Sequence, residues 1–267
     1  DEFDLAEASL LVAEDVYPDV DLEGTLEQLD RMAMTVRGRL AMDAFPEQKV
    51  LALNHHLFHE LGFAGNVDDY YDPRNSYLNE VLARRTGIPL TLSIVYLEVG
   101  RRLGLDLKGV SFPGHFLVKL VLRSGQLVLD PFLNGEAQSA SALRERLASV
   151  LPAERSEAGL DALPLEPFLE AATPRQVVAR LLRNLKHIYR EAAQWDKALA
   201  VMHRMLLVLP ESAEELRDRG FFYQELECFR PALIDLQGYL RRRGDAPDAR
   251  DVRARIEELK AACARLN

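Results

Sequence analysis

The spacing of the hydrophobic residues changes along the chain, and this change limits the folds that the sequence can adopt. Up to Leu103, apolar residues recur every three or four positions, which is typical of amphipathic helices. Short β-rich runs follow, at residues 107–112, 116–122 and 126–129. Ser124-Gly125 between the last two runs favours a tight hairpin. Helical spacing then returns, so the sequence predicts an α+β fold that is mainly helical with one small antiparallel sheet.

Two helices are expected to meet before the predicted sheet. Asn75 or Ser76 can cap a helix that Gly87 ends, because Asn and Ser side chains accept hydrogen bonds at helix starts and Gly is common just after helix ends. Pro89 suits the first turn of the next helix, which continues to Leu103. The start of this second helix is therefore predicted at Pro89.

The C-terminal third repeats its pattern at 34 residues, the period of the tetratricopeptide repeat. Tyr189 and Ala198 in the first copy match Tyr223 and Ala232 in the second, and the stretch from 248 to 266 is expected to be a capping helix. The segment from Pro152 to Pro167 is rich in Ala, Glu and Pro without periodicity, as linkers are. We therefore expect a first domain over 1–165, with a helical part at 1–66, and a repeat domain over 173–267.

The charge distribution excludes some partners. Residues 1–72 hold 17 acidic and 4 basic residues, a net charge of −13, whereas the remainder carries +4. An acidic surface repels phosphate backbones, so we expect no nucleic-acid partner. The most apolar stretch, Ile88 to Val99, is shorter than a membrane span, which takes roughly 20 residues, so no membrane partner is expected.

The termini and cysteines indicate the compartment. The chain begins Asp1-Glu2-Phe3-Asp4, which is acidic where a signal peptide is basic, so a cytoplasmic location is expected. Two cysteines are present, Cys228 and Cys263, both within helical patterns. This number is too small for a disulfide framework or a Cys-based zinc site, and we expect buried thiols.

No cofactor or metal is predicted. His55 and His59 share a helix face, but a zinc site needs three or four protein ligands, and Glu60 is the nearby candidate. The acidic loop from Asp68 to Asp72 lacks the ordered spacing of a calcium loop. No glycine-rich phosphate loop is present either.

His115 and Asp130 are the candidate catalytic pair. His115 follows Pro113-Gly114 and Asp130 precedes Pro131, on strands that we expect to be neighbours. In Cys-His-Asp hydrolases and acyl transferases the imidazole accepts the proton of the thiol, and the carboxylate orients the imidazole. Such a pair also needs a nucleophile, which usually stands at a helix N-terminus.

A combination of short motifs resembles the bacterial SirB-type family, in which a transglutaminase-like domain precedes tetratricopeptide repeats. The motifs span most of the chain: residues 69–82 (DYYDPRNSYLNEVL), 87–93 (GIPLTLS), 113–118 (PGHFLV) and 130–132 (DPF). The resemblance implies a papain-like fold, with His115 and Asp130 matching the His and Asp of transglutaminase-like domains. Their catalytic Cys stands about fifteen residues before a Leu-Gly pair, here Leu103-Gly104. Counting back leads to Pro89, which has no side-chain heteroatom.

Four other residues could supply a nucleophile. Thr91 and Ser93 lie within one turn of Pro89, and Ser93 would share its helix face, although one turn displaces the hydroxyl by roughly 6 Å. Cys228 and Cys263 belong to the repeat domain. We expect His115 and Asp130 to be a remnant pair without a nucleophile.

Further residues are candidates for binding rather than catalysis. Asn75 and Asn79 belong to the first motif, and we expect them mainly to order the loop by hydrogen bonds to the backbone. Ser93 is a candidate in the cleft. On the concave face of the repeats, which we expect beside that cleft, the candidates are Asn184, His187 and Arg219.

Two functions fit these residues. The favoured hypothesis is a non-catalytic adaptor or regulator, in which an inactivated transglutaminase-like domain and the repeats bind a protein or peptide. The alternative is a hydrolase or acyl transferase for peptide or amide bonds, which would use His115 and Asp130 with an unrecognised nucleophile. Pro89 separates the two.

Overall fold

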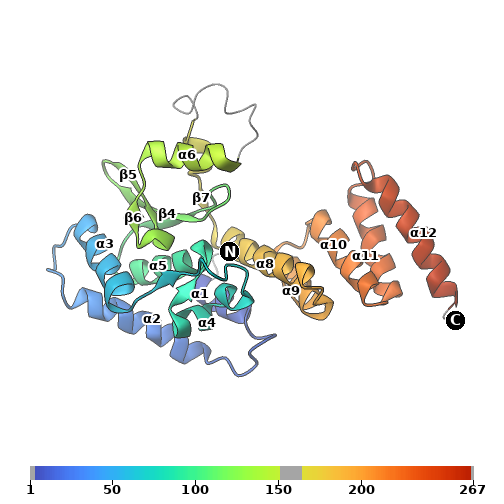
Figure 1. The fold of residues 1–267 in the computed structure, drawn as a ribbon, viewed down its shortest axis with the longest axis horizontal. Coiled ribbons are helices and arrows are strands. Elements are labelled where there is room, and N and C mark those ends of the chain that lie inside the picture. The colour runs from blue at the N-terminus through green and yellow to red at the C-terminus, as the bar shows by residue number, and fades with distance from the viewer. Residues whose placement is uncertain (1–3, 151–163, 266–267) are drawn as a thin grey trace. The chain divides into compact units, whose positions relative to one another are not determined.

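A computed structural model describes residues 4–150 and 164–265 (Figure 1). The chain divides into two compact units, Asp1–Leu181 and Leu182–Asn267, and the division falls within helix α8 (Pro174–Glu191). Most of the predicted linker, residues 151–163, lies outside the described ranges. The predicted domain limits at 165 and 173 stay predictions.

One buried helix organises the first unit. The helices of its first half are α1 (Leu5–Leu11), α2 (Leu22–Arg37), α3 (Pro46–Asn54), α4 (Leu78–Arg84) and α5 (Pro89–Arg102). Every residue of α5 from Pro89 to Gly100 is buried, because the helix packs against the other four and against strands β3 and β4. In residues 4–150 and 164–265, no helix is long and apolar enough to cross a membrane.

The limits of α4 differ from the predicted ones. Neither Asn75 nor Ser76 caps this helix, because the preceding residues Pro73–Ser76 form a 3-10 turn and Tyr77 takes the capping position without a side-chain hydrogen bond. The helix ends at Arg84 rather than at Gly87, and Arg85 adopts the left-handed conformation with φ 56°. Gly87 instead belongs to the short strand β2 (Thr86–Gly87).

A five-stranded sheet follows α5 and is antiparallel throughout, as predicted. Its strand order is β6-β5-β4-β3-β7. The two-residue turn between β4 and β5 is Arg123-Ser124, one residue before the predicted Ser124-Gly125, because Gly125 already pairs with Leu122 as the first residue of β5. The strands are β3 (Leu107–Val110), β4 (Leu117–Leu122), β5 (Gly125–Asp130), β6 (Glu136–Ala137) and β7 (Ala171–Ala172). The helix α6 (Ala140–Val150) buries Leu143 and Leu147 against sheet residues such as Val128.

A second, smaller pairing lies at the start of α5. Strand β1 (Ala64–Gly65) runs parallel to β2, with Gly65 opposite Gly87. The short turn Pro131–Leu133, which follows β5, packs against both β1 and α5. The start of α5 and the end of β5 therefore lie in one neighbourhood.

The second unit is all-helical, as the repeat pattern predicts. Its helices are the end of α8, α9 (Trp195–Val208), α10 (Ala213–Glu225), α11 (Phe229–Arg242) and α12 (Ala249–Arg265). From α9 onward, each helix packs against the next one in sequence. Ala198 and Ala232 are fully buried, which allows close approach of paired helices. The prediction of buried thiols is wrong: Cys228 is exposed at the start of α11 and Cys263 is half-buried in α12.

Candidate functional site

The structure brings His115 and Asp130 together. His115 Nε2 lies 3.0 Å and 2.9 Å from the two carboxylate oxygens of Asp130. Both side chains are buried, and because a carboxylate accepts hydrogen bonds, Nε2 carries the hydrogen and Nδ1 is the acceptor nitrogen. This arrangement orients an imidazole that can accept a proton at Nδ1, the task of a general base.

Three further groups support this pair. The amide of Phe132 donates to Asp130 Oδ1 at 3.0 Å, and Arg146 of α6 donates to Oδ2 at 3.2 Å. Arg180 of α8 donates to the carbonyl of His115 at 2.7 Å and to that of Phe112 at 3.3 Å. Burial lowers the pKa of Arg180 below its ordinary value, although the nearby Tyr70 opposes this shift. No motif or spacing in the sequence singles out Arg146 or Arg180.

A chain of contacts links the start of α5 to His115. Gly87, two residues before Pro89, pairs with Gly65. The ring of Phe132 occupies the space above Gly65, where an added Cβ would lie 2.3 Å from it. The Phe132 ring also contacts the ring of His115. The two rings meet edge-on, with 5.9 Å between their centroids. Pro89 is the first residue of α5, as predicted, and therefore occupies the helix N-terminus of this neighbourhood.

The two hydroxyls near Pro89 are placed differently. Thr91 Oγ1 accepts the amide hydrogen of Ile88 at 3.1 Å and donates to the carbonyl of Asn75 at 2.7 Å, so it serves the helix start. Ser93 is fully buried, and its Oγ has no hydrogen-bond partner in the described structure. Among the described residues, no hydroxyl or thiol is hydrogen-bonded to the His115 ring. Cys228 and Cys263 belong to the second unit.

Asn75 orders the acidic loop before α4. Its Nδ2 donates to the carbonyls of Asp69 at 2.7 Å and Tyr70 at 3.3 Å, and its Oδ1 accepts from Asn66 at 3.1 Å. The structure gives Asn79 no comparable role, since its buried Oδ1 has no partner in the described residues.

An ion pair closes the same loop. Asp72 pairs with Arg74 at 2.7 Å and Arg84 at 3.5 Å. Burial opposes ionisation of Asp72, but the hydrogen bonds from Arg74 hold the pKa of this carboxyl below its ordinary value.

The candidates in the repeats lie on α8 and α10. Asn184 is half-buried and His187 is exposed, both in the part of α8 that belongs to the second unit. Arg219 forms a two-pronged ion pair with the buried Asp235, at 2.6 Å and 2.8 Å. The guanidinium of Arg219 therefore binds α10 to α11.

The histidine cluster lies on a π-helical turn (His55–Glu60) and surrounds the Glu60 carboxylate. His56 Nδ1 lies 2.7 Å and His55 Nε2 lies 3.3 Å from the Glu60 carboxylate, while the rings of His55 and His59 stack. The hydrogen bond from Arg39, with that of His56, lowers the pKa of Glu60 to about 2. In the described part of the chain, no group of three or more His, Cys, Asp or Glu is arranged to hold a metal ion.

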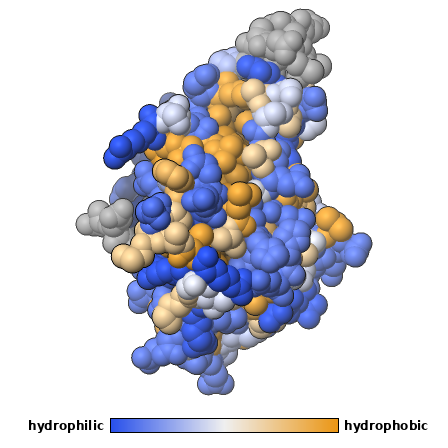
Figure 2. Space-filling view, turned by 90° about the vertical axis from the view of Figure 1, so that its left-hand side faces the viewer, coloured by the Kyte–Doolittle hydropathy of each residue, from blue (hydrophilic) through white to orange (hydrophobic). Residues whose placement is uncertain are grey.

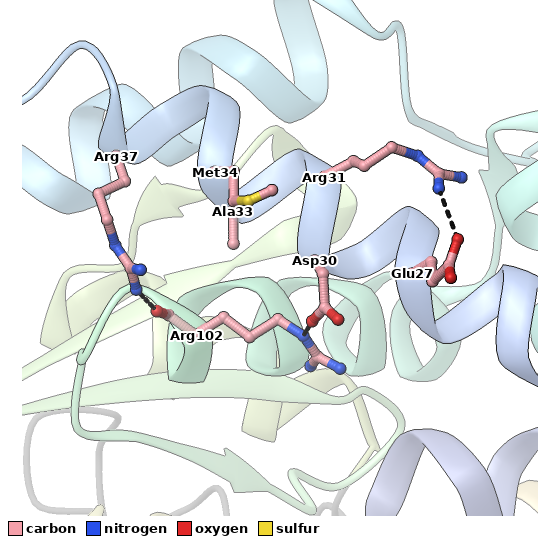
Figure 3. Close-up of a pocket in the computed structure, with 7 residues that line it drawn as sticks. All are labelled: Glu27, Asp30, Arg31, Ala33, Met34, Arg37 and Arg102. Atoms are coloured by element: carbon pink, nitrogen blue, oxygen red, sulfur yellow. Dashed lines mark hydrogen bonds and ion pairs between the residues drawn. The ribbon is translucent and has the colours of Figure 1, made fainter.

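A cavity of about 540 Å³ lies between α2 and the end of α5 (Figure 3). Its charged residues already interact with one another: Arg31 pairs with Glu27 at 3.1 Å, and Arg102 pairs with Asp30 at 2.5 Å. Arg37 also donates to the backbone carbonyl of Arg102. Four of the charged residues of this cavity are therefore paired with one another, whereas the Arg37 guanidinium contacts a backbone carbonyl.

Comparison with known proteins agrees with this fold. Residues 23–183 match the model of the transglutaminase-like superfamily, and residues 185–257 match a tetratricopeptide-repeat model. A UPF0162 protein of Xylella fastidiosa is 43% identical over 238 residues, 88% of this chain and 83% of the relative. A UPF0162 protein of Vibrio cholerae is 30% identical over 97% of this chain and 93% of its own length.

A more distant relative carries the SirB name. Protein SirB1 of Salmonella typhimurium is 26% identical over 96% of this chain and 92% of its own length. No solved structure was found to match the chain. The family-model matches and the identities of these relatives show that the chain belongs to the transglutaminase-like superfamily, in its SirB-type branch with a tetratricopeptide-repeat region.

Proposed function

We propose that this protein is a non-catalytic adaptor or regulator, in which an inactivated transglutaminase-like domain and the repeats bind a protein or peptide partner in the cytoplasm. The observation that carries the proposal is Pro89 at the first position of α5. Transglutaminase-like catalysis needs a nucleophile at this position, and proline has no side-chain heteroatom to attack a carbonyl.

The surroundings of His115 support the proposal. A nucleophile is activated when its hydroxyl or thiol gives its proton to a base within hydrogen-bond reach. The hydroxyl of Thr91 is used at the helix start, and that of Ser93 is buried without any described partner. His115 and Asp130 then have a structural role, since they tie β5 to the segment before β4.

The repeat region supports the binding part of the proposal. Tetratricopeptide repeats stack helix pairs into extended surfaces that suit protein segments. The residues proposed to contact the partner are Asn184 and His187 on α8 and the half-buried Asn79 of the transglutaminase-like domain. Asn75 and Ser93, which were also binding candidates, are fully buried, so they support that domain and do not touch a partner. The proposed partner is a protein or peptide.

An acyl-trapping experiment tests the absence of catalysis. The chain, with Cys228→Ser and Cys263→Ser to remove background labelling, is incubated with activated ester and amide substrates and measured by intact mass. We expect no acylated protein and no substrate turnover above that of the matched His115→Ala variant.

The opposite result would support the enzyme hypothesis. An acyl group trapped on Thr91 or Ser93, and lost with His115→Ala, would show that an unrecognised nucleophile works with the His115–Asp130 pair. The protein would then be a hydrolase or acyl transferase, and the adaptor proposal would be wrong.

A further inference from the structure

A second cavity of about 540 Å³ lies on a different face of the first unit from Asp130. One wall is α3 with the π-helical turn that follows it, and the other is formed by β5, β6 and the loop between them. Leu127 and Leu129 of β5 line it, whereas Val128 and Asp130 do not, because side chains alternate between the two faces of a strand. We call this cavity the sheet-edge groove.

The floor of the sheet-edge groove is apolar. Leu127, Leu129 and Ala137 line it from the sheet, and Val50 and Leu51 line it from α3. The Leu51 side chain is 68% exposed, although leucine usually gains free energy on burial. Figure 2 views the side on which α3, β5 and β6 lie, and shows a band of hydrophobic residues bordered by hydrophilic ones.

The groove is preformed by a fixed contact between its two walls. Asn54 Nδ2 donates to the carbonyl of Gly135 at 2.9 Å, and Asn54 Oδ1 accepts from the Tyr96 hydroxyl at 2.7 Å. Gly135 has φ 75°, and an added Cβ would lie 2.3 Å from the Asn54 amide. Glycine at this position therefore allows α3 and the β5–β6 loop to approach, and a preformed site loses less entropy when it binds.

Two carboxylates border the apolar floor without compensating cations. Glu47 lies in the first turn of α3 and Glu136 lies in β6. Within the described ranges neither carboxylate forms an ion pair, in contrast to the charged residues of the cavity at α2. His55 and His59 of the π-helical turn also line the groove. An apolar floor bordered by two carboxylates without ion-pair partners complements an apolar side chain that has cations next to it.

The backbone beside the groove is a sheet edge. β6 is only two residues long, and it pairs with Leu129 and Asp130 of β5. No described strand pairs with the outer side of β6. An exposed edge can accept one more strand from an extended peptide, whose alternate side chains then enter the neighbouring pocket.

We infer that the sheet-edge groove binds an extended segment of a partner protein that carries an apolar residue flanked by Lys or Arg. The apolar side chain enters between Leu51 and Leu127, and the cations pair with Glu47 and Glu136. The segment's backbone adds to the edge at β6. This site goes beyond the proposed function, because it is independent of His115 and of the repeats.

A displayed library of random hexapeptides tests the inference with the full-length chain. We expect the chain to enrich sequences with an apolar residue between basic ones. For a labelled enriched peptide, Leu51→Asp should weaken binding about tenfold, because it places a charge on the apolar floor. Glu47→Lys and Glu136→Lys should each weaken binding about threefold, and less so at high salt.

Two matched variants control for general effects of these changes. Leu207→Asp alters another exposed leucine, in α9, and Glu23→Lys alters an acidic residue in the first turn of α2, as Glu47 is in α3. Both should leave binding unchanged. Circular dichroism would confirm that every variant is folded.

Several outcomes would overturn the inference. The inference is wrong if the selection enriches no sequence with an apolar residue between basic ones. It is also wrong if the groove variants leave the binding of the enriched peptides unchanged, or if His115→Ala abolishes that binding instead. Self-association that Leu51→Asp abolishes would identify a second copy of the chain as the occupant, and would also contradict the inference. The acyl-trapping result is unaffected by any of these, so the two proposals fail separately.

Discussion

Asp130 is a buried carboxylate with three hydrogen-bonding partners: the His115 ring, the Phe132 amide and the Arg146 guanidinium. A buried charge is costly unless such partners compensate it. A transglutaminase-like enzyme would use this pair as a general base and the carboxylate that orients it, and here the pair is also part of the folded core. If Pro89 stands at the nucleophile position, as proposed, this structural role gives a physical reason for the presence of the pair.

Removing this carboxylate should destabilise the first unit. Asp130→Ala leaves Arg146 and His115 without their anion, and we expect the free energy of unfolding to fall by roughly 3–5 kcal/mol. Urea unfolding followed by circular dichroism measures the loss, while the fluorescence of Trp195 in α9 follows the second unit. A loss below about 1 kcal/mol would show that the pair contributes little to folding.

Glu60 gives a pH-dependent prediction. The Arg39 and His56 hydrogen bonds lower its folded-state pKa from 4.5 to about 2, so the stabilisation is present above pH 4.5 and is lost as pH falls toward 2. The destabilisation by Glu60→Gln should therefore be larger at pH 6 than at the acid end of this window. Urea unfolding midpoints of the wild-type chain and the Glu60→Gln variant at several pH values check this prediction. Asp19→Asn, at an exposed carboxylate, is the control. A destabilisation by Glu60→Gln that does not change with pH would contradict the prediction.

The sequence pointed to His115 and Asp130 but not to their supporting residues. The pair was identifiable because each residue stands beside turn residues at the ends of strand patterns, and because of the family resemblance. Arg146 and Arg180 lie on amphipathic helices among other arginines, and their roles depend on packing of α6 and α8 against distant carbonyl and carboxylate groups. No local pattern encodes such contacts.

The start of α5 depends on Thr91. Its hydroxyl satisfies both the Ile88 amide and the Asn75 carbonyl, and thereby joins the helix to the loop before α4. Thr91→Val keeps the shape but leaves both groups unpaired, so we expect a loss of about 2 kcal/mol in unfolding free energy. Thr91→Ser keeps the hydroxyl and should cost under about 1 kcal/mol; equal losses for the two variants in urea titrations would exclude this role.

Long periodic elements were predicted better than short ones. The helix α5 begins at Pro89, as the proline indicated, and ends at Arg102, one residue before the predicted Leu103. The two-residue strands β1, β2 and β7 are too short for periodicity, and they form because a distant segment offers backbone partners. The end of α4 was mispredicted because Arg85 adopts the left-handed conformation that Gly usually takes.

The division of the chain within α8 gives a prediction about its fragments. Val177, Val178 and Leu181 in the first half of α8 are buried, and Arg180 donates to two carbonyls of the first unit. A fragment of residues 1–191 should therefore have a larger free energy of unfolding than one of residues 1–173. The expected difference is roughly 4 kcal/mol, because the longer fragment buries these apolar side chains. Thermal unfolding compares them, and equal stability would place the domain end before α8.

Pro89→Cys, in a chain that also carries Cys228→Ser and Cys263→Ser, tests whether Pro89 stands where the nucleophile of a transglutaminase-like enzyme would be. If Pro89 occupies the nucleophile position, the new thiol lies at a helix N-terminus near His115. The ultraviolet absorbance of its thiolate should then give a pKa clearly below the ordinary value of about 8.5, and His115→Ala should raise it. A pKa at or above the ordinary value that is unchanged by His115→Ala would show that Pro89 does not stand where the nucleophile would be.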